Sequence, residues 1–549
     1  MNWILGLILI LVIIFFTNNY SKKKKLKKLK SRLIKEWGKP KIGEYFNFYV
    51  IGRYFNNNKH KDIAFHRISE KVKIDLDIDD IFKFIDRTCS KIGQQYLYFK
   101  LRTIGSFDDL LKFDSLVSIF ETNKTLRLNC QINLSKLNTN NSYYLEELIN
   151  GKQIDKSNIL WLVRLLSVSS LISLFLTFIY PIFILLLILI FTLNIFFHYK
   201  NKGNINYYLN GIDQLSKSLK VCKTLVNNPE IKEHYNDLSF LKKIDLIKVK
   251  SEFIGFDKYL KNEYALIFWF PVELIKIQFN LEYLMFFSFI DSIIKEKENI
   301  EKMFLYIGEI DSAISTASLK ASEKQTCTPK FIKNKSLSSK NIYHPLIDNC
   351  IPNDLNLNNN SMLLTGSNMS GKTTFIRTIA VNSILAQTLN ICFAKEYTAP
   401  FFKVYTSIRI TDDLLDKTSY YLQEVLTVKE LVEASKNNEN CLFILDEIFK
   451  GTNTIERISG GKAILSFLNQ SNHIVFVSTH DIELTDLLEE ENYELFHFSE
   501  QVKKDELQFD HKLKKGKLIT RNAIKILELY KYPSEIITDA RMTEQKNFS

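Results

Sequence analysis

Between residues 362 and 389 the sequence passes from a short apolar run through a glycine-rich turn into a long helical run. A strand, a glycine loop and a helix in this order favour an α/β domain that binds phosphate, because backbone N–H groups and the positive helix end surround phosphate oxygens. The turn fits the pattern GxxxxGK[ST]. It predicts a nucleotide-binding loop made of these consecutive residues: Gly366, Ser367, Asn368, Met369, Ser370, Gly371, Lys372, Thr373 and Thr374.

Two side chains at the end of this loop have predicted chemical roles. Lys372 is expected to reach the β- and γ-phosphates of ATP and so to support catalysis as well as binding. Thr373 offers a hydroxyl to Mg²⁺, which binds proteins through few side chains together with phosphates and waters. ATP and Mg²⁺ are therefore the predicted substrate and metal.

An acidic pair follows the next apolar run. Cys441–Leu445 has the pattern of a buried parallel strand, and it ends in Asp446 and Glu447. We expect Asp446 to hold Mg²⁺ and Glu447 to orient or deprotonate the attacking water. The alternative role for the pair is helix capping.

A third apolar run, His473–Val477, is followed by Ser478, Thr479 and His480. Ligands bind at strand ends in open α/β sheets, so His480 is predicted to lie near the γ-phosphate as a catalytic residue. A structural histidine is the ordinary alternative. Three strand ends are thus expected to converge on one ATP-hydrolysing site.

The N-terminus resembles a membrane anchor. Trp3–Phe16 is apolar, and nine Lys or Arg residues lie between Lys22 and Lys35, so the remaining chain carries only about +3 of the net charge of +12. Positive charge after an apolar run differs from a secretory signal, in which it comes first. We predict an uncleaved anchor whose basic side is cytoplasmic.

A second membrane region is predicted from Leu165 to Phe197, which contains no charged residue. As one helix it would be ~50 Å long against a hydrocarbon core of ~30 Å, so Pro181 is interpreted as the turn of a hairpin. Three spans in total keep the ATPase domain in the cytoplasm. The apolar stretch Tyr264–Ile290 is interrupted by charged residues at helical spacing and is expected to form a buried helix of a soluble domain.

Beyond the glycine loop, several segments resemble the MutS family of DNA mismatch repair ATPases. They are Tyr343–Leu346, Gly366–Thr373, Asp446–Thr454 and Ser478–His480. Ser419 lies in a segment similar to that family's trans-acting signature, and the resemblance implies that it contacts the γ-phosphate bound by a partner subunit. Lys417 stands where the family usually has glycine. A homodimer with composite ATP sites is therefore implied.

The resemblance is weaker upstream. Phe84–Gln95 is similar to the start of the MutS core domain, and Ile307–Leu319 to the end of its lever helices. A Phe-x-Glu motif for mismatch reading is missing from the N-terminal third. DNA is implied as a partner by the resemblance alone, because outside Lys22–Lys35 the sequence has no basic stripe for phosphate contacts.

The predicted fold class is mixed, with a mostly α-helical core, about three transmembrane helices and a C-terminal α/β P-loop ATPase domain of the ABC type. The predicted domains are a transmembrane anchor (1–20), a basic juxtamembrane linker (21–67), the first part of the helical core (68–158), a transmembrane hairpin (159–199), the second part of the core with its levers (200–335), and the ATPase domain with a helical tail (336–549). Arg521–Ala540 is expected to be helical with a break at Pro533.

Three functions compete. The first is a membrane-anchored, MutS-like ATPase coupled to DNA; the others are a nucleotide-driven membrane complex of the transporter type and a nucleotide-gated scaffold. The segment Ile458–Lys462 looks like the LSGGQ signature of transporter ATPases, but it follows the acidic pair, whereas that signature precedes it. It is predicted to be a helix-packing segment.

Overall fold

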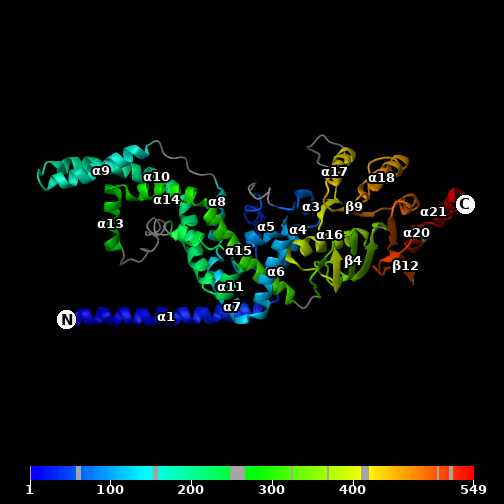
Figure 1. Cartoon of the computed structure of the whole chain (residues 1–549), viewed down its shortest axis with the longest axis horizontal. Coiled ribbons are helices and arrows are strands. Elements are labelled where there is room, and N and C mark those ends of the chain that lie inside the picture. Colours follow the sequence, from blue (N-terminus) through cyan, green and yellow to red (C-terminus); the bar gives the residue numbers. More distant parts are fainter. Residues whose placement is uncertain are drawn as a thin grey trace. The chain divides into compact units, whose positions relative to one another are not determined.

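The computed structural model describes most of the chain (Figure 1): residues 2–56, 64–151, 159–235, 237–245, 247, 266–322, 325–367, 370–409, 420–503, 506–518 and 523–548. It is a mixed structure in which helices predominate. The chain forms two compact units, each discontinuous in sequence. We call them the helical unit (Met1–His60, Ile85–Phe99 and Phe113–Ala321) and the sheet unit (Lys61–Phe84, Lys100–Lys112 and Ser322–Ser549).

The described part of the helical unit contains helices and short helical turns. They are α1 (Asn2–Glu36), α2 (Phe48–Ile51), α7 (Lys124–Leu134), η2 (Ser135–Leu137), η3 (Asn140–Tyr143), α8 (Tyr144–Asn150), α9 (Leu160–Thr177), α10 (Phe183–Val226), α11 (Pro229–His234), α13 (Leu266–Gln278), α14 (Leu281–Lys295) and α15 (Lys297–Lys320). Helices α5 (Lys91–Leu101) and α6 (Phe107–Thr122) contribute residues to both units.

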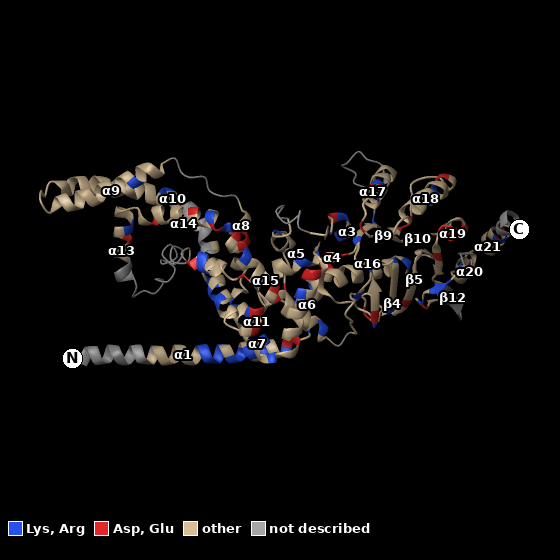
Figure 2. Cartoon of the chain, viewed as in Figure 1, with Lys and Arg blue, Asp and Glu red and all other residues tan. Residues whose placement is uncertain are grey.

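Helices α9 and α10 form an antiparallel pair with Pro181 in the turn between them. Two described segments are long and apolar enough to cross a membrane, Leu160–Thr177 and Phe183–Lys200. Only 28% and 17% of these segments are buried, so most of their apolar surface is not covered by the residues that the structure describes. Figure 2 shows the contrast with α1, whose basic run is blue, whereas the apolar segments of α9 and α10 are mostly tan.

The stretch expected to form one buried helix is divided. Helix α13 contains Pro271, and Asn280 adopts a left-handed φ of 46° between α13 and α14. Phe270–Gln278 and Leu281–Lys295 meet at a bend of 69°, and together they are also long and apolar enough to cross a membrane. The described helices thus supply two, or up to three, candidate membrane spans.

The two upstream segments that resemble the MutS core pack against each other. The buried Asp311 carboxylate of α15 accepts hydrogen bonds from the Cys89 and Ser90 N–H groups, both at 2.8 Å. Burial raises the Asp311 pKa to about 6, although these hydrogen bonds oppose the shift. A Cβ on Gly93 would lie 2.1 Å from this carboxylate, so only glycine permits the close approach of α5.

A six-stranded sheet organises the sheet unit, in the order β14-β11-β6-β10-β9-β8. The five strands from β11 to β8 are parallel, and β14 pairs antiparallel with β11. Its strands are β6 (Ser361–Thr365), β8 (Lys403–Ser407), β9 (Cys441–Asp446), β10 (Ile474–Ser478), β11 (Tyr493–His497) and β14 (Lys514–Lys515). The three strands predicted to begin at Met362, Cys441 and His473 are therefore present as β6, β9 and β10, and they are neighbours in this sheet.

Smaller sheets and helices complete this unit. The remaining strands are β1 (His66–Arg67), β2 (Thr103–Ile104), β3 (Lys330–Phe331), β4 (Ser336–Ile342), β5 (Asn353–Asn358), β7 (Glu396–Ala399), β12 (Glu500–Lys503) and β13 (Glu506–Phe509). The helices are α3 (Glu70–Asp75), α4 (Ile78–Ile85), α16 (Lys372–Leu389), α17 (Tyr420–Ser435), α18 (Thr454–Leu468), α19 (Glu483–Glu489), α20 (Ala523–Leu529) and α21 (Ser534–Phe548). The break predicted at Pro533 lies between α20 and α21, as expected.

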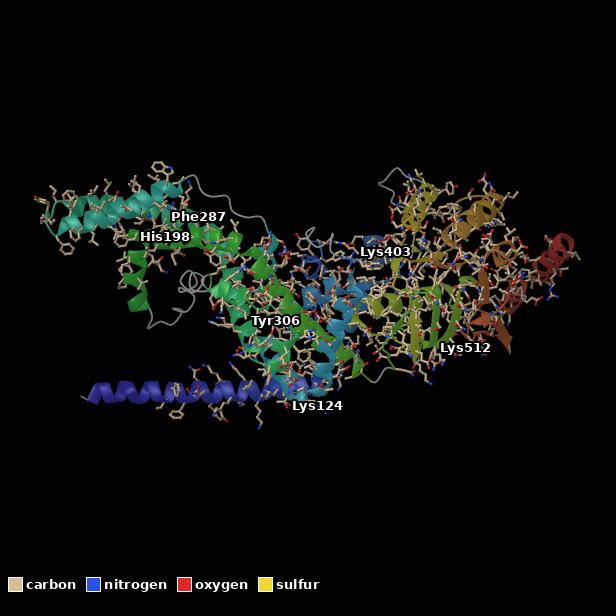
Figure 3. The ribbon with its side chains drawn as sticks, in the orientation of Figure 1. Lys124, His198, Phe287, Tyr306, Lys403 and Lys512 are labelled. Atoms are coloured by element: carbon tan, nitrogen blue, oxygen red, sulfur yellow. The ribbon has the colours of Figure 1, made fainter. Side chains whose placement is uncertain are left out.

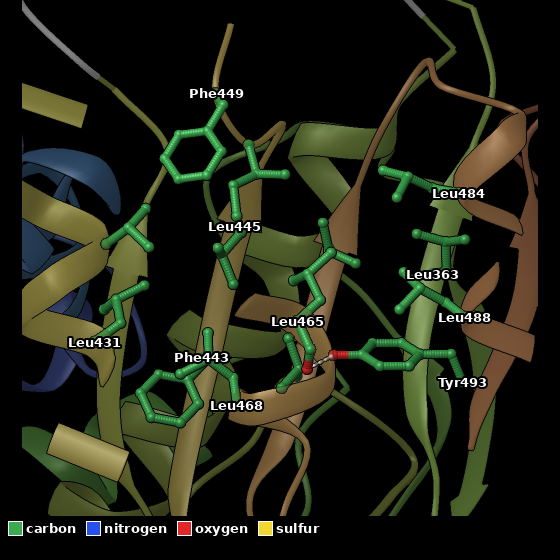
Figure 4. Close-up of a cluster of buried hydrophobic side chains, with 14 of the residues drawn as sticks. Leu363, Leu431, Phe443, Leu445, Phe449, Leu465, Leu468, Leu484, Leu488 and Tyr493 are labelled. Atoms are coloured by element: carbon green, nitrogen blue, oxygen red, sulfur yellow. Dashed lines mark hydrogen bonds between the residues drawn. The ribbon is translucent and has the colours of Figure 1, made fainter. Parts of the chain in front are cut away.

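One face of the central sheet packs under α17, α18 and α19 (Figure 4). Phe443 and Leu445 of β9 and Leu363 of β6 are fully buried there, against leucines of the covering helices. The Tyr493 hydroxyl donates to the Leu465 carbonyl at 2.8 Å, so the one polar group of this tyrosine is satisfied inside the apolar layer. This core fixes the strand ends that carry the candidate site.

Candidate functional site

The glycine loop joins β6 to α16. Gly366 and Gly371 have φ of 150° and 109°, and a Cβ on Gly366 would lie 2.9 Å from both the Phe498 carbonyl and the Ser370 hydroxyl. Glycine is therefore required for the backbone path. Two predicted members of the loop, Asn368 and Met369, lie outside the described residues.

Lys372 points back into this loop. Its ammonium donates to the Gly366 carbonyl at 2.7 Å and to the Ser367 carbonyl at 2.9 Å, and it lies 3.3 Å from Nε2 of His480. The side chain is buried, so the loop holds the positive charge at its centre. Phosphate oxygens are the natural partners for an ammonium in this position.

A pair of oxygen atoms lies beside Lys372. The Thr373 hydroxyl donates to Oδ2 of Asp446 at 2.8 Å, and the other Asp446 oxygen accepts from the Ser478 hydroxyl. Two ligands on adjacent corners of an Mg²⁺ octahedron lie about 3.0 Å apart when each bond is about 2.1 Å. Thr373 and Asp446 therefore fit the metal site predicted for them, and Ser478 orients the carboxylate.

Glu447 follows the end of β9 in an unusual backbone conformation. Its φ is 62°, and its N–H donates to the Ser478 carbonyl at 2.8 Å. The carboxylate lies 3.3 Å from His480 Nε2 and 3.5 Å from the Lys450 ammonium. Left-handed backbone in a non-glycine residue clusters at functional sites, and here it occurs at the acid predicted to act on the water.

His480 completes a group that we call the strand-end cluster: Lys372, Thr373, Asp446, Glu447 and His480. Partial burial and the Lys372 ammonium hold the His480 pKa below its ordinary value, although the two acidic residues oppose the shift. The imidazole is thus neutral at pH 7 and can donate or accept one hydrogen bond. The structure brings together all of the residues for which catalysis or metal binding was predicted.

Two further groups support the cluster and were missed from the sequence. The Arg457 guanidinium makes a bidentate pair with Asp481, at 2.8 and 2.6 Å, next to His480 in the chain. Buried Glu424 accepts the Lys450 N–H at 3.2 Å and so ties α17 to the loop after β9. Both contacts join residues far apart in sequence, and short motifs carry no signal for them.

The LSGGQ-like segment Ile458–Lys462 has the helix-packing role predicted for it. Gly460 and Gly461 lie in α18, where a Cβ would meet the Phe449 ring at 3.2 Å and the Ile448 side chain at 3.0 Å. The glycines let α18 approach the loop that carries Glu447.

A cavity of about 350 Å³ lies beside the glycine loop and was also missed. Gly371 and Thr374 form its edge, and Tyr343, Phe375, Phe498 and His511 are among its other lining residues. A pocket of this size with aromatic walls suits a planar group. Tyr343 belongs to a segment singled out in the sequence, but its place beside the loop depends on the fold.

Ser419 cannot be placed, because it lies outside the described residues together with Lys417. The predicted contact with a partner subunit therefore stays a prediction.

Comparison with known proteins gives a consistent result. The profile of MutS domain V matches residues 362–547. The DNA mismatch repair protein MutS of Staphylococcus haemolyticus (strain JCSC1435) is 31% identical over 274 residues, covering 48% of this chain and 31% of the relative. MutS of Staphylococcus aureus (strain JH9) is 30% identical over 273 residues with the same coverage. The aligned region spans about a third of the length of these relatives.

Proposed function

This chain is a MutS-family protein, and from that premise we propose that it binds and hydrolyses ATP at the strand-end cluster. The observation that carries the proposal is the convergence of Lys372, Asp446, Glu447 and His480 from three adjacent strand ends. Ligands bind at this edge of open parallel sheets. The sequence match to MutS domain V covers the same residues.

Each member of the cluster then has a role. Lys372 exchanges its two carbonyl partners for oxygens of the β- and γ-phosphates, and the loop N–H groups hold the remaining phosphate charge. Thr373 and Asp446 would hold Mg²⁺, which neutralises charge on the phosphates when bound. Glu447 accepts a proton from the attacking water, and neutral His480 donates a hydrogen bond toward the γ-phosphate.

The aromatic cavity supplies the base site. Its edge residues Gly371 and Thr374 belong to the loop, so a nucleoside attached to bound phosphates reaches it directly. Phe498 and His511 offer flat surfaces for an adenine ring. In this proposal the whole nucleotide lies within the sheet unit.

The membrane and dimer parts of the proposal rest on different observations. The α9–α10 pair and the basic run of α1 support anchoring with the ATPase on the cytoplasmic side. Family resemblance supports a homodimer in which Ser419 reaches the partner's nucleotide, and ATP binding that is coupled to DNA. A nucleotide-driven membrane complex is the second candidate, favoured by the exposed apolar surface of α9 and α10.

The test is steady-state ATP hydrolysis by the full chain in detergent, with Lys372→Ala as the binding-deficient variant. Duplex, branched and mismatched DNA are added across a salt series. Hydrolysis that is lost in Lys372→Ala supports the ATPase, and stimulation by DNA that falls steeply with salt supports the DNA-coupled function. Hydrolysis indifferent to every DNA favours the membrane complex, whereas equal rates in both proteins would refute the site.

A further inference from the structure

A second group of titratable side chains lies in the helical unit, far along the chain from the ATPase motifs. His198 of α10 faces Glu273 of α13 and Glu282 of α14: its Nε2 lies 3.3 Å from Oε1 of Glu273 and 3.7 Å from Oε2 of Glu282. One ligand atom from each residue lies within 4.8 Å of the others. Lys276 lies behind them, 3.7 Å from the other oxygen of Glu273. Figure 3 labels His198 in this region. We call these four residues the helix-break cluster.

The break between α13 and α14 creates this arrangement. Asn280 donates to Asn194 at 2.6 Å, and Asn194 in turn donates to the Gln278 carbonyl, also at 2.6 Å. The Ser170 hydroxyl donates to the same carbonyl at 3.0 Å. Backbone freed by a broken helix is tolerated among apolar helices only where neighbouring groups satisfy it, as they do here. Glu273 and Glu282, on either side of the break, are thereby fixed opposite α10.

Burial makes the cluster costly unless it binds positive charge. The four side chains are exposed by only 1–7%, and they lie on or beside apolar helices that are candidate membrane spans. Two carboxylates brought together in such a medium repel each other strongly and lose their hydration. Lys276 lies against the outer oxygen of Glu273, and the inner oxygens of both carboxylates are directed toward His198.

We propose that the helix-break cluster is a binding site for a divalent transition metal, with His198, Glu273 and Glu282 as ligands. In a tetrahedral site with bonds of about 2.0–2.2 Å, ligand atoms lie about 3.3–3.6 Å apart. The separation of 3.3 Å between His198 and Glu273 falls in this range, that of 3.7 Å between His198 and Glu282 is slightly above it, and the two carboxylate oxygens lie within 4.8 Å of each other. Three protein ligands leave the fourth position for water or an exogenous group.

The ligand set selects the class of metal. An imidazole nitrogen together with two carboxylates suits zinc, manganese, iron, cobalt or nickel, whereas Mg²⁺ and Ca²⁺ prefer oxygen ligands throughout. Lys276 is a positioning residue here, since its ammonium holds the outer oxygen of Glu273 and directs the inner one to the metal. In the competing arrangement the cluster holds no metal, and His198 and Lys276 pair with the carboxylates directly.

Metal analysis separates these arrangements. The full chain is purified in detergent without nucleotide, stripped with a chelator, reloaded with Zn²⁺ and desalted, and its zinc is measured by mass spectrometry. We expect one tightly held zinc per chain in the unaltered protein and in His234→Ala, a control histidine of the same unit. His198→Ala and Glu282→Gln should lose it. Zinc that is absent from the unaltered protein, or equal in all variants, would overturn the site.

A cobalt spectrum distinguishes the loss of the metal site from a failure of a variant to fold. Co²⁺ in a tetrahedral site of nitrogen and oxygen ligands absorbs visible light, and Zn²⁺ should displace it from the unaltered protein. His198→Cys should retain Co²⁺ and gain a near-ultraviolet sulfur-to-cobalt band, which a merely structural histidine would not produce. Helical content measured by circular dichroism confirms folding. Unaltered protein that gives no tetrahedral cobalt bands refutes the proposal by itself.

Discussion

The two units each contain a histidine, a lysine and two acidic residues in close contact, but in opposite surroundings. In the strand-end cluster the Glu447 and His480 side chains are 29% and 39% exposed, whereas His198 and Glu273 in the helix-break cluster are 1% and 7% exposed. Water and a large ligand can reach the first. The second is almost closed to solvent, and a small ion is the size of ligand that suits it.

This difference determines what each cluster can tolerate. At an exposed site, removing a charge changes chemistry more than stability, because solvent screens what remains. At a buried site, removing one charge leaves its partner without compensation in a medium of low polarity. Substitutions in the strand-end cluster should therefore affect mainly catalysis, and substitutions in the helix-break cluster mainly the stability of the fold.

Glu447→Gln is expected to have the largest effect. The amide keeps the shape of the side chain but cannot accept the water's proton, so kcat should fall by about 10²- to 10⁴-fold while ATP remains bound. Nucleotide binding and single-turnover hydrolysis measure the two separately. Glu483→Gln, an exposed acid of α19, is the control and should keep the normal rate. Unchanged turnover in Glu447→Gln would exclude it as the base.

Lys276→Met tests the buried cluster. The change removes the ammonium that lies 3.7 Å from Glu273, and the loss of one member of a buried ion pair costs about 3–5 kcal/mol. Thermal unfolding in detergent should show this loss of stability. The control is Lys217→Met, which removes an exposed i,i+4 ion pair on α10 and should change stability little.

Added Zn²⁺ sharpens this result. Because the metal brings positive charge to the same carboxylates, it should raise the unfolding temperature of Lys276→Met toward that of the unaltered protein. If Lys276→Met is as stable as the unaltered protein when both lack zinc, Lys276 does not stabilise the buried carboxylates.

The contrast also explains how much the sequence could predict. The strand-end cluster comes from short contiguous segments, each joined to an apolar strand, so strand order alone brings Lys372, Asp446 and His480 together. The three strands and the break at Pro533 were predicted for the same reason, since each depends on local pattern.

The helix-break cluster depends on residues from three helices. Glu273, Lys276 and Glu282 were visible as charges within an apolar stretch, but helical spacing suggested one soluble helix. The bend at Asn280 is a tertiary feature stabilised by Asn194 and Ser170, which lie far away in sequence. Charges inside an apolar stretch were the available signal, and they mark function more often than a soluble surface.

A fall in pH should lower the stability of the sheet unit and raise that of the helical unit. Burial lowers the His66 pKa to about 4, so the unfolded sheet unit binds a proton first, and stability falls from pH 6.5 to 4 by at most about 3 kcal/mol. Burial raises the Asp311 pKa to about 6, so the folded helical unit binds a proton first and gains stability as pH falls from 6 to 4.

Urea unfolding at several pH values checks this difference. The four tryptophans all belong to the helical unit, so their fluorescence follows that unit, while a Tyr405→Trp probe follows the sheet unit. His66→Gln should reduce the acid sensitivity of the sheet unit alone. Parallel pH curves for the two probes would contradict the assignment of opposite proton linkage.

Glu424→Gln should have the smallest effect, because it alters the support of the strand-end cluster and none of its reacting groups. Glu424 is buried and accepts the Lys450 N–H, and Lys450 lies in the loop that carries Glu447. An amide oxygen accepts more weakly than a carboxylate, by about 1 kcal/mol, so kcat should fall less than about tenfold with little change in KM. Glu430→Gln, exposed on the same helix, is the matched control. A loss as large as that of Glu447→Gln would mean that Glu424 takes part in the reaction, and that burial does not separate supporting from reacting acids in this unit.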